Sequence, residues 1–145
     1  MKILLDTNIL VHAYNRASPL HRKASDIVRR ALRREIEVCI TPQILYEFFA
    51  VVTNPKRVEY PLSADEAADI CLDLWECREI EKINPTTTTP LKVFKLIKQL
   101  NLSGGEIFDC VLAVTANENN VKEIYTENLE DFKRYNFLKV SNPLV

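Results

Sequence analysis

Short apolar runs alternate with longer segments of helical periodicity along this chain, and that alternation restricts its fold more than any other feature. Lys2–Asp6 is such a run, and the residues after it, which Asn8 is suited to cap, recur at helical spacing. Glu37–Thr41 is rich in β-favouring residues, and Pro42 suits the first turn of a following helix. Because neighbouring parallel strands need crossover connections, strand–helix units in series predict a mainly parallel sheet covered by helices.

The rest of the chain continues this pattern in what we expect to be one domain over residues 1–145. Its 145 residues are 47% hydrophobic, enough for one buried core, and two glycines with scattered prolines indicate no linker. We expect further helices at 20–35, 43–53, 63–79, 91–100 and 106–119, and further strands at 81–84, 122–126 and 137–141. The expected fold class is α/β, with three α/β/α layers and a crevice where the carboxyl ends of the strands meet.

Composition argues against several classes of protein. The apolar start is too short for a secretory signal or for a membrane span of about 20 residues, so we expect a soluble, cytoplasmic protein. The four cysteines show no Cys-x-x-Cys spacing and lie in apolar stretches, which favours small buried side chains over zinc ligands or disulfides. These cysteines are Cys39, Cys71, Cys77 and Cys110. A formal net charge of −1 argues against a polycation that coats nucleic acid, although it is compatible with local basic surfaces.

Three acids stand at positions that need an explanation. Asp6 ends the first expected strand and would face the crevice, although an acid there can also simply cap the next helix. Glu47 lies in a nearly all-apolar helix, where a charge is costly unless it is paired, hydrated or bound to a metal. A surface glutamate that reaches water is the alternative. Asp109 lies in a similar apolar segment, where a buried, hydrogen-bonded aspartate is the alternative.

Carboxylates gathered in one crevice repel each other and raise at least one pKa, and a divalent cation removes that penalty. All-oxygen ligands favour hard ions, so Mg²⁺ or Mn²⁺ fits this set better than zinc. Such ions suit phosphodiester hydrolysis, because they activate a water and stabilise charge on the attacking and leaving oxygens. The chain has no glycine-rich phosphate loop, no Gly-x-Ser-x-Gly elbow and no Cys/His pairing, which argues against nucleotide triphosphatases, serine hydrolases and thiol enzymes.

Four segments, in their order and spacing, resemble the PIN-domain ribonucleases, particularly the single-domain VapC-like toxins of toxin–antitoxin pairs. The segments are Ile3–Leu10, Pro42–Phe48, Phe108–Ala116 and Tyr125–Phe132. The resemblance spans the whole chain and implies a PIN-like fold with metal-dependent ribonuclease activity. By position it makes Asp6, Glu47 and Asp109 the first three metal ligands, with Thr7 and Thr126 as polar groups beside them.

The chain departs from this family at one position. Many members have an acid two residues after the threonine that ends the fourth strand, and this chain has Asn128 there. An asparagine carbonyl can still ligate, but it adds no negative charge, so a second metal ion would be held more weakly. Asp131 and Glu106 are the candidates for a compensating acid, although both are equally compatible with solvated surface positions.

The resemblance also implies single-stranded RNA as substrate, a homodimer and, if the gene belongs to a toxin–antitoxin pair, a small antitoxin protein in the crevice. RNA needs basic groups around an acidic pocket, and two helix faces offer them, although both also fit ordinary solvated surfaces. The first face carries Arg29, Arg30, Arg33 and Arg34, and the second carries Lys92, Lys95 and Lys98. His12, Tyr14 and Arg16 follow Asp6 closely enough to reach a bound strand. Apolar helices at 44–52 and 70–75 are candidate dimer faces or plain core.

Metal-dependent cleavage of RNA that leaves a 5′-phosphate is the expected reaction, and three alternatives remain open. Asp6 could be the nucleophile of an aspartyl-phosphate enzyme, but such enzymes usually have a second acid two positions on, where this chain has Asn8. A regulatory module that binds magnesium without nuclease turnover is the second alternative. Asn128 also permits a catalytically weakened PIN-like scaffold that only binds RNA or protein.

Overall fold

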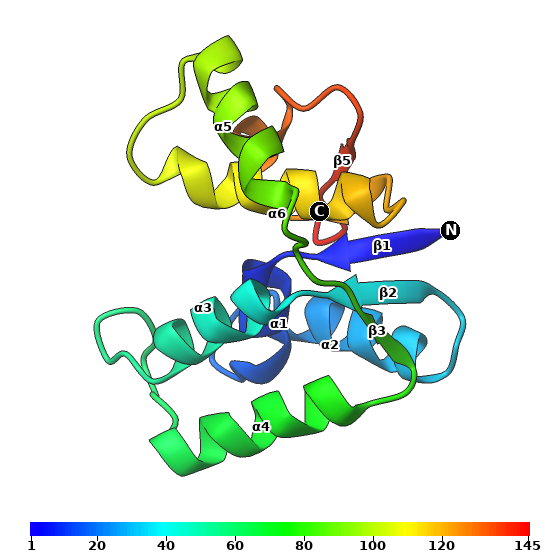
Figure 1. Cartoon of the computed structure of the whole chain (residues 1–145). Helices are drawn as coiled ribbons and strands as arrows, with labels where there is room; N and C mark the ends of the chain where they lie inside the picture. The colour runs from blue at the N-terminus through cyan, green and yellow to red at the C-terminus, as the bar shows by residue number, and fades with distance from the viewer.

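A five-stranded, fully parallel sheet lies at the centre of the protein (Figure 1). The computed structural model describes all residues, 1–145, and places the strands in the order β3-β2-β1-β4-β5. The strands are β1 (Lys2–Leu5), β2 (Glu37–Ile40), β3 (Ile80–Lys82), β4 (Glu123–Tyr125) and β5 (Lys139–Ser141). Each neighbouring pair is parallel, which confirms the predicted α/β class and sheet type.

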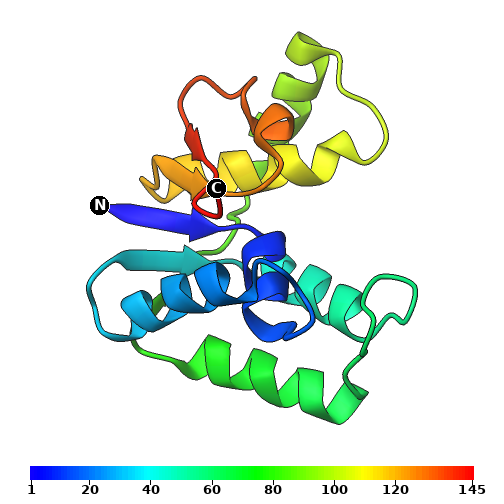
Figure 2. The same ribbon diagram turned by 180° about the vertical axis from the view of Figure 1, so that it is seen from behind.

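Seven helices cover the sheet in two groups. They are α1 (Thr7–Tyr14), α2 (His21–Leu32), α3 (Pro42–Val52), α4 (Ala64–Glu76), α5 (Thr89–Leu100), α6 (Glu106–Glu118) and α7 (Leu129–Phe132). Helix α1 packs on α2 and α3, and α3 packs on α4, whereas α5 packs on α6 and α6 on α7. The first group lies with β2 and β3, and the second lies with β4 and β5 (Figure 1). Figure 2 shows the same arrangement from behind, with α1 and α2 on the side of β2 and β3. None of these helices has both the length and the apolar character needed to cross a membrane.

Local sequence signals explain where several helices begin. Thr41 caps α3 by accepting a hydrogen bond from the backbone N–H of Ile44, and Pro42 occupies the first turn, as predicted. Ser63 and Glu66 form a capping box at the start of α4, in which each side chain bonds the other's backbone N–H. Each of these starts depends on residues adjacent in sequence, which is why the sequence predicts them.

Three details of the sequence prediction were wrong. Asp6, and not Asn8, is the N-cap of α1, because the helix already begins at Thr7. The third strand begins at Ile80, one residue before the predicted start, because it pairs with Val38 of β2. The short helix α7 was not predicted, since its four residues contain too little periodicity to distinguish it from a loop.

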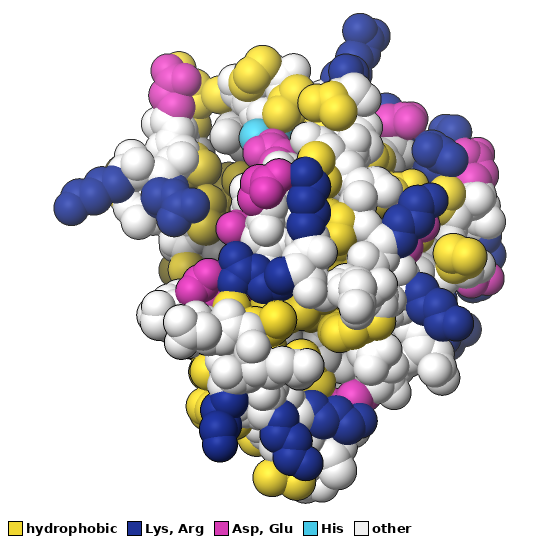
Figure 3. Space-filling model, turned by 90° about the horizontal axis from the view of Figure 1, so that it is seen from above, with side chains coloured by type: hydrophobic (Ala, Val, Ile, Leu, Met, Phe, Trp, Pro, Cys, Tyr) yellow, Lys and Arg dark blue, Asp and Glu magenta, His cyan; other side chains and the backbone are white.

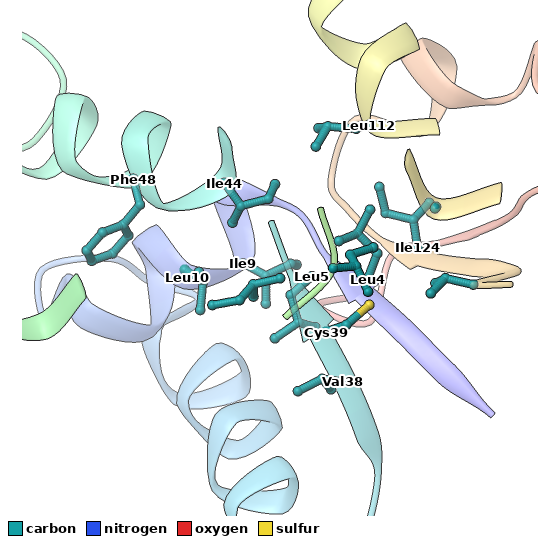
Figure 4. Packing of buried hydrophobic residues seen from close by; sticks show 14 of the residues in the cluster. Leu4, Leu5, Ile9, Leu10, Val38, Cys39, Ile44, Phe48, Leu112 and Ile124 are labelled. Atoms are coloured by element: carbon teal, nitrogen blue, oxygen red, sulfur yellow. The ribbon is translucent and has the colours of Figure 1, made fainter. Parts of the chain in front are cut away.

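The core is one cluster of 33 buried residues that spans both sides of the sheet. Leu4 in β1 is fully buried, as expected for a parallel strand covered on both faces. Figure 4 shows Leu10 of α1 and Phe48 of α3 packing on one side of β1, and Leu112 of α6 on the other. The four cysteines are free, with Cys39 and Cys110 fully buried, as predicted, and the other two partly buried.

The order of the strands brings Asp6 and Thr126 together. The connection after β1 leads to β2 on one side, whereas the connection after β4 leads to β5 on the other, so the chain switches direction between β1 and β4. Hydrogen bonding continues past both strands, because the N–H of Asp6 donates to Tyr125 O (3.0 Å) and that of Thr126 to Ser141 O (2.9 Å). Sheets of this type bind ligands at such a switch point, outside the carboxyl ends of the strands.

Phe48 tests the contribution of the α1–α3 contact to stability. Its side chain is fully buried and meets Tyr14 edge-to-face, with ring centroids 5.7 Å apart. We expect Phe48→Ala to lower the free energy of unfolding by about 3–5 kcal/mol, because the truncation leaves a cavity. Urea denaturation followed by circular dichroism measures this value. Phe94→Ala is the matched control, since Phe94 is 56% exposed, and its change should stay within about 0.5 kcal/mol. Equal losses in the two variants would contradict this account of the core.

Candidate active site

A polar pocket of about 470 Å³ opens at the carboxyl edge of the sheet and brings together the three predicted acids. Asp6 reaches it from the end of β1, Glu47 from α3 and Asp109 from the first turn of α6, and Asn128 borders it from the β4–α7 connection. These residues are far apart in sequence, so the fold alone makes them neighbours. In the view from above, acidic side chains gather beside a histidine next to a hollow in the surface (Figure 3).

Asp6 is the most buried of the three acids, with 5% of its surface exposed. Its Oδ1 accepts a hydrogen bond from the N–H of Thr7 (2.8 Å). Its Oδ2 accepts bonds from Thr126 Oγ1 (2.7 Å) and Asn8 Nδ2 (3.3 Å). Burial raises the pKa of this carboxyl, the hydrogen bonds from Thr126, Thr7 and Asn8 counter that rise, and the nearby charge of Asp131 adds to it. Asp6 is therefore both the helix cap and a rigidly held pocket carboxylate, which joins the two interpretations of its sequence position.

Glu47 is partly buried on the face of α3 that lines the pocket. Gln43, one helical turn earlier, donates from Nε2 to Glu47 Oε1 (2.6 Å) and also to the carbonyl of Phe108 (3.1 Å). Burial raises the pKa of Glu47, as does the charge of Asp6, whereas Gln43 and Thr7 lower it. Gln43 thus holds Glu47 and ties α3 to the start of α6, a role that sequence reasoning did not identify.

Asp109 has the most perturbed carboxyl in the pocket. Burial, followed by the charges of Asp131, Asp6 and Glu47, raises its pKa from 3.8 to about 7. The only opposing charge is that of Arg134. A carboxylate this costly to ionise next to other carboxylates is the electrostatic pattern expected of a cation site.

Asn8, Glu127 and His12 also line the pocket, and sequence reasoning missed the first two as site residues. Asn8 donates to Asp6 and to Thr126, and its Oδ1 accepts from the N–H of Glu127 (3.2 Å). The Glu127 carboxylate contacts His12 Nε2, and His12 Nδ1 lies 2.6 Å from Ser18 Oγ. The available signals were the position of Asn8 two residues after Asp6 and that of Glu127 directly after Thr126. Tyr14 and Arg16, named with His12 in the sequence analysis, do not line the pocket.

The three weaker ligand candidates have different positions. Asn128 lines the pocket and is exposed, and its N–H donates to Thr126 Oγ1 (3.0 Å). Asp131 is exposed and does not line the pocket, yet its charge raises the pKa of both Asp6 and Asp109. Glu106 also lies outside the pocket, because Arg134 Nη1 (2.7 Å) and the N–H of Ser103 (3.0 Å) hold its carboxylate. Glu106 is thus bound to other groups, so Asp131 is the better candidate for the acid that compensates for Asn128.

The donors around the pocket fit a hard divalent cation. The carboxylates of Asp6, Glu47 and Asp109 and the amide of Asn128 supply oxygen, and no cysteine lines the pocket. The hydroxyl of Thr7 is buried beside these acids without a hydrogen-bond partner. In their present positions, no three Asp, Glu, His or Cys side chains are arranged to hold one ion.

The predicted basic faces do not border the pocket. Arg29, Arg30 and Arg34 pair with Asp26, Glu35 and Glu79, and Lys92 pairs with Glu118. None of the seven predicted arginines and lysines lines the pocket. The only arginine or lysine that does so is Arg57, in the connection between α3 and α4. These faces are exposed helix surfaces away from the pocket, and their contact with RNA stays a prediction.

An apolar groove of about 510 Å³ separates α3 from α4. Leu45, Phe49 and Trp75 line it, with Tyr46 and Leu72 at its surface. Leu45 belongs to the core, whereas Tyr46 is 73% and Leu72 57% exposed. The two apolar helices are thus partly core and partly exposed, so neither interpretation of them from the sequence was complete.

Comparisons with known proteins agree with this fold. A family model described as PIN domain matches residues 3–138. The chain belongs to the PIN-domain family. Ribonuclease VapC24 of Mycobacterium tuberculosis is 30% identical to it over 97% of this chain and 95% of that protein. Ribonuclease VapC48 of the same species is 22% identical over 99% of this chain and 98% of that protein.

Solved structures support the PIN fold over the full length. VapBC-1 from nontypeable Haemophilus influenzae aligns with a TM-score of 0.68 and 17% identity, covering 100% of both chains. VapBC2 from Rickettsia felis, bound to a DNA fragment from its promoter, aligns with a TM-score of 0.66 and 23% identity, covering 98% of both chains. These likenesses confirm the three-layer PIN-like architecture that the sequence predicted.

The pKa of Asp109 predicts a pH-dependent effect of Asp109→Asn in metal-free buffer. Because folding raises this pKa from 3.8 to about 7, its stabilising contribution is complete below pH 3.8 and is lost as the pH rises through 7. We expect Asp109→Asn to raise the free energy of unfolding at pH 8, on the order of 1 kcal/mol after solvent screening. At pH 4 the two proteins should be nearly equal. Urea denaturation with chelator at both values measures the difference.

Asp69→Asn is the matched control, because Asp69 is an exposed acid of α4 outside the pocket. It should not share the gain at pH 8. A change for Asp109→Asn that has the same size at both pH values would contradict the crowding of carboxylates described here.

Proposed function

We propose that this chain is a divalent-metal-dependent endoribonuclease that cleaves single-stranded RNA and acts as the toxin of a toxin–antitoxin pair. The convergence of Asp6, Glu47 and Asp109 on one pocket carries the proposal. The relatives at up to 30% identity are named ribonucleases, which supports the class of reaction. Asp6, Glu47 and Asp109 are the proposed catalytic metal ligands, with Mg²⁺ or Mn²⁺ as the proposed ion. We also propose the cytoplasm, where RNA is available, as the location.

Each pocket residue has a distinct task in this proposal. Thr126 and Asn8 fix Asp6, and Gln43 fixes Glu47, so that both carboxylates face the pocket before the ion arrives. Asp109 would help to hold the ion in its ionised form, which a nearby cation would favour by compensating the charges that raise its pKa. A bound divalent ion supplies an activated water and stabilises charge on the phosphodiester oxygens. The products would then carry 5′-phosphate ends.

The number of metal ions that the pocket can hold depends on Asn128 and Asp131. Asn128 offers a carbonyl oxygen without charge, and Asp131 is near enough to act electrostatically but lies outside the pocket. Three carboxylates with one neutral ligand favour one firmly held ion over two equal ones, since charge count sets affinity for hard cations. This composition still permits hydrolysis, because a single ion can both orient and activate a water.

Cleavage of a labelled single-stranded RNA tests the proposal directly. We expect turnover with Mg²⁺ or Mn²⁺, 5′-phosphate products and complete inhibition by EDTA. Asp6→Asn and Asp109→Asn should each lower the rate by about 100-fold or more, because each removes a charged ligand. Gel electrophoresis of time courses, with phosphatase treatment of the products, measures rate and end chemistry.

Asp69→Asn serves again as the control and should retain full activity. Cleavage that is insensitive to EDTA, or full activity in Asp109→Asn, would rule out this mechanism. Binding of RNA without turnover in any metal would instead favour the scaffold alternative. Hydroxylamine-sensitive labelling of Asp6 would favour aspartyl-phosphate chemistry.

We further propose that the chain forms a homodimer and pairs with a small antitoxin protein. The solved relatives titled VapBC, and one titled toxin-antitoxin complex from Klebsiella pneumoniae, support the antitoxin. The homodimer rests on the family resemblance alone. We expect light scattering to give twice the mass of one chain, and co-expression with a small protein from the adjacent gene to restore growth and block RNA cleavage. The mass of a single chain in light scattering would contradict the homodimer. RNA cleavage that the adjacent gene product does not block would contradict the antitoxin.

A further inference from the structure

Arg57 lines the acidic pocket and lies in the turn that follows α3. The N–H groups of Arg57 (2.9 Å) and Val58 (3.1 Å) donate to Asn54 O, and the N–H of Lys56 donates to Asn54 Oδ1 (2.9 Å). Val58 is buried and anchors the turn to the protein. The backbone around Arg57 is therefore well determined, although its side chain is exposed.

The charge of Arg57 is not committed to any acid. Its guanidinium forms no ion pair or hydrogen bond within the protein, unlike Arg134, which is held by Glu106. It is also not among the main influences on the pKa of Asp6, Glu47 or Asp109, although all four residues line one pocket. Arg57 thus lines the pocket without pairing with its carboxylates.

The pocket wall runs from the acids toward Arg57. Ala50 and Val51 follow Glu47 by three and four residues, so they lie on the same face of α3 and extend the wall by one helical turn, about 5.4 Å. The turn with Arg57 continues beyond them. The acids and the arginine therefore occupy different parts of one pocket, an arrangement that suits a polyanion whose reacting phosphate and neighbouring phosphate need different environments.

We propose that Arg57 binds a phosphate of the single-stranded RNA next to the one being cleaved and so positions the strand. The inference rests on the proposed function, because RNA is the polyanion that function places in the pocket. Arginine is suited to the task, since its planar guanidinium binds phosphate oxygens through two parallel hydrogen bonds. Arg57 is a positioning residue in this proposal and takes no part in activating water.

Binding to an uncleaved strand tests the proposal apart from catalysis. A fluorescent single-stranded RNA is titrated in Mg²⁺ with the full chain carrying Asp109→Asn, and anisotropy gives Kd across a series of salt concentrations. Arg57→Ala in this background should raise Kd about tenfold at low salt. The slope of log Kd against log salt should fall by about 0.7, the value for one phosphate contact on a single strand. Arg57→Lys should restore the slope and only part of the affinity.

Lys56→Ala is the matched control, because Lys56 is an exposed cation of the same turn that does not line the pocket. Equal Kd and slope for Arg57→Ala and Lys56→Ala, or no RNA binding at all, would overturn the proposal. In the cleaving protein, Arg57→Ala should raise KM about tenfold and leave kcat within about twofold. If the protein cleaves no RNA but its RNA binding depends on Arg57, the phosphate-binding role is supported and the nuclease activity is refuted. If Arg57→Ala cleaves RNA with an unchanged KM, the nuclease activity is supported and the role of Arg57 is refuted.

Discussion

The parallel pairing of β1 with β4 places Asp6 within hydrogen-bonding distance of Thr126, which is 120 residues away in the sequence. That pairing also determines the rest of the site. Asn8 spans the same gap from α1 to Glu127, and α3 follows β2, the other neighbour of β1. Without the β1–β4 register, Asp6 would still cap a helix, but it would lose its hydrogen bond from Thr126. The chemistry of the pocket is therefore a property of the sheet order.

Electrostatic cost is the second theme of the structure. The protein holds Asp6, Glu47 and Asp109 partly or fully out of water. The charge of Asp6 raises the pKa of Glu47, and the charges of both raise the pKa of Asp109, which rises to about 7. Hydrogen bonds from Thr126, Asn8 and Gln43 offset part of this cost for two of the acids. Carboxylates kept together at this electrostatic cost are the pattern expected of a cation site.

Helix α3 contributes residues to the acidic pocket, the apolar groove and the core. Glu47 and Ala50 line the acidic pocket, Leu45 and Phe49 line the apolar groove toward α4, and Phe48 fills the core. The turn that ends the helix carries Arg57. This distribution explains why α3 is nearly all apolar yet contains one glutamate. The apolar residues of α3 pack in the core or line the groove, and its single charged side chain, Glu47, lines the acidic pocket.

The sequence by itself determined the elements and the three central acids, because strand runs, helix caps and charges in apolar helices are local signals. Pro42 and Glu47 are examples whose roles followed from their immediate neighbours. Only the tertiary structure decided which remaining residues meet. It placed Glu127 and Arg57 at the pocket, and it held Glu106 outside the pocket through a hydrogen bond from Arg134. These contacts join segments whose spatial proximity depends on the sheet order. Local patterns encode burial and periodicity, whereas the partner of a charge is set by long-range packing.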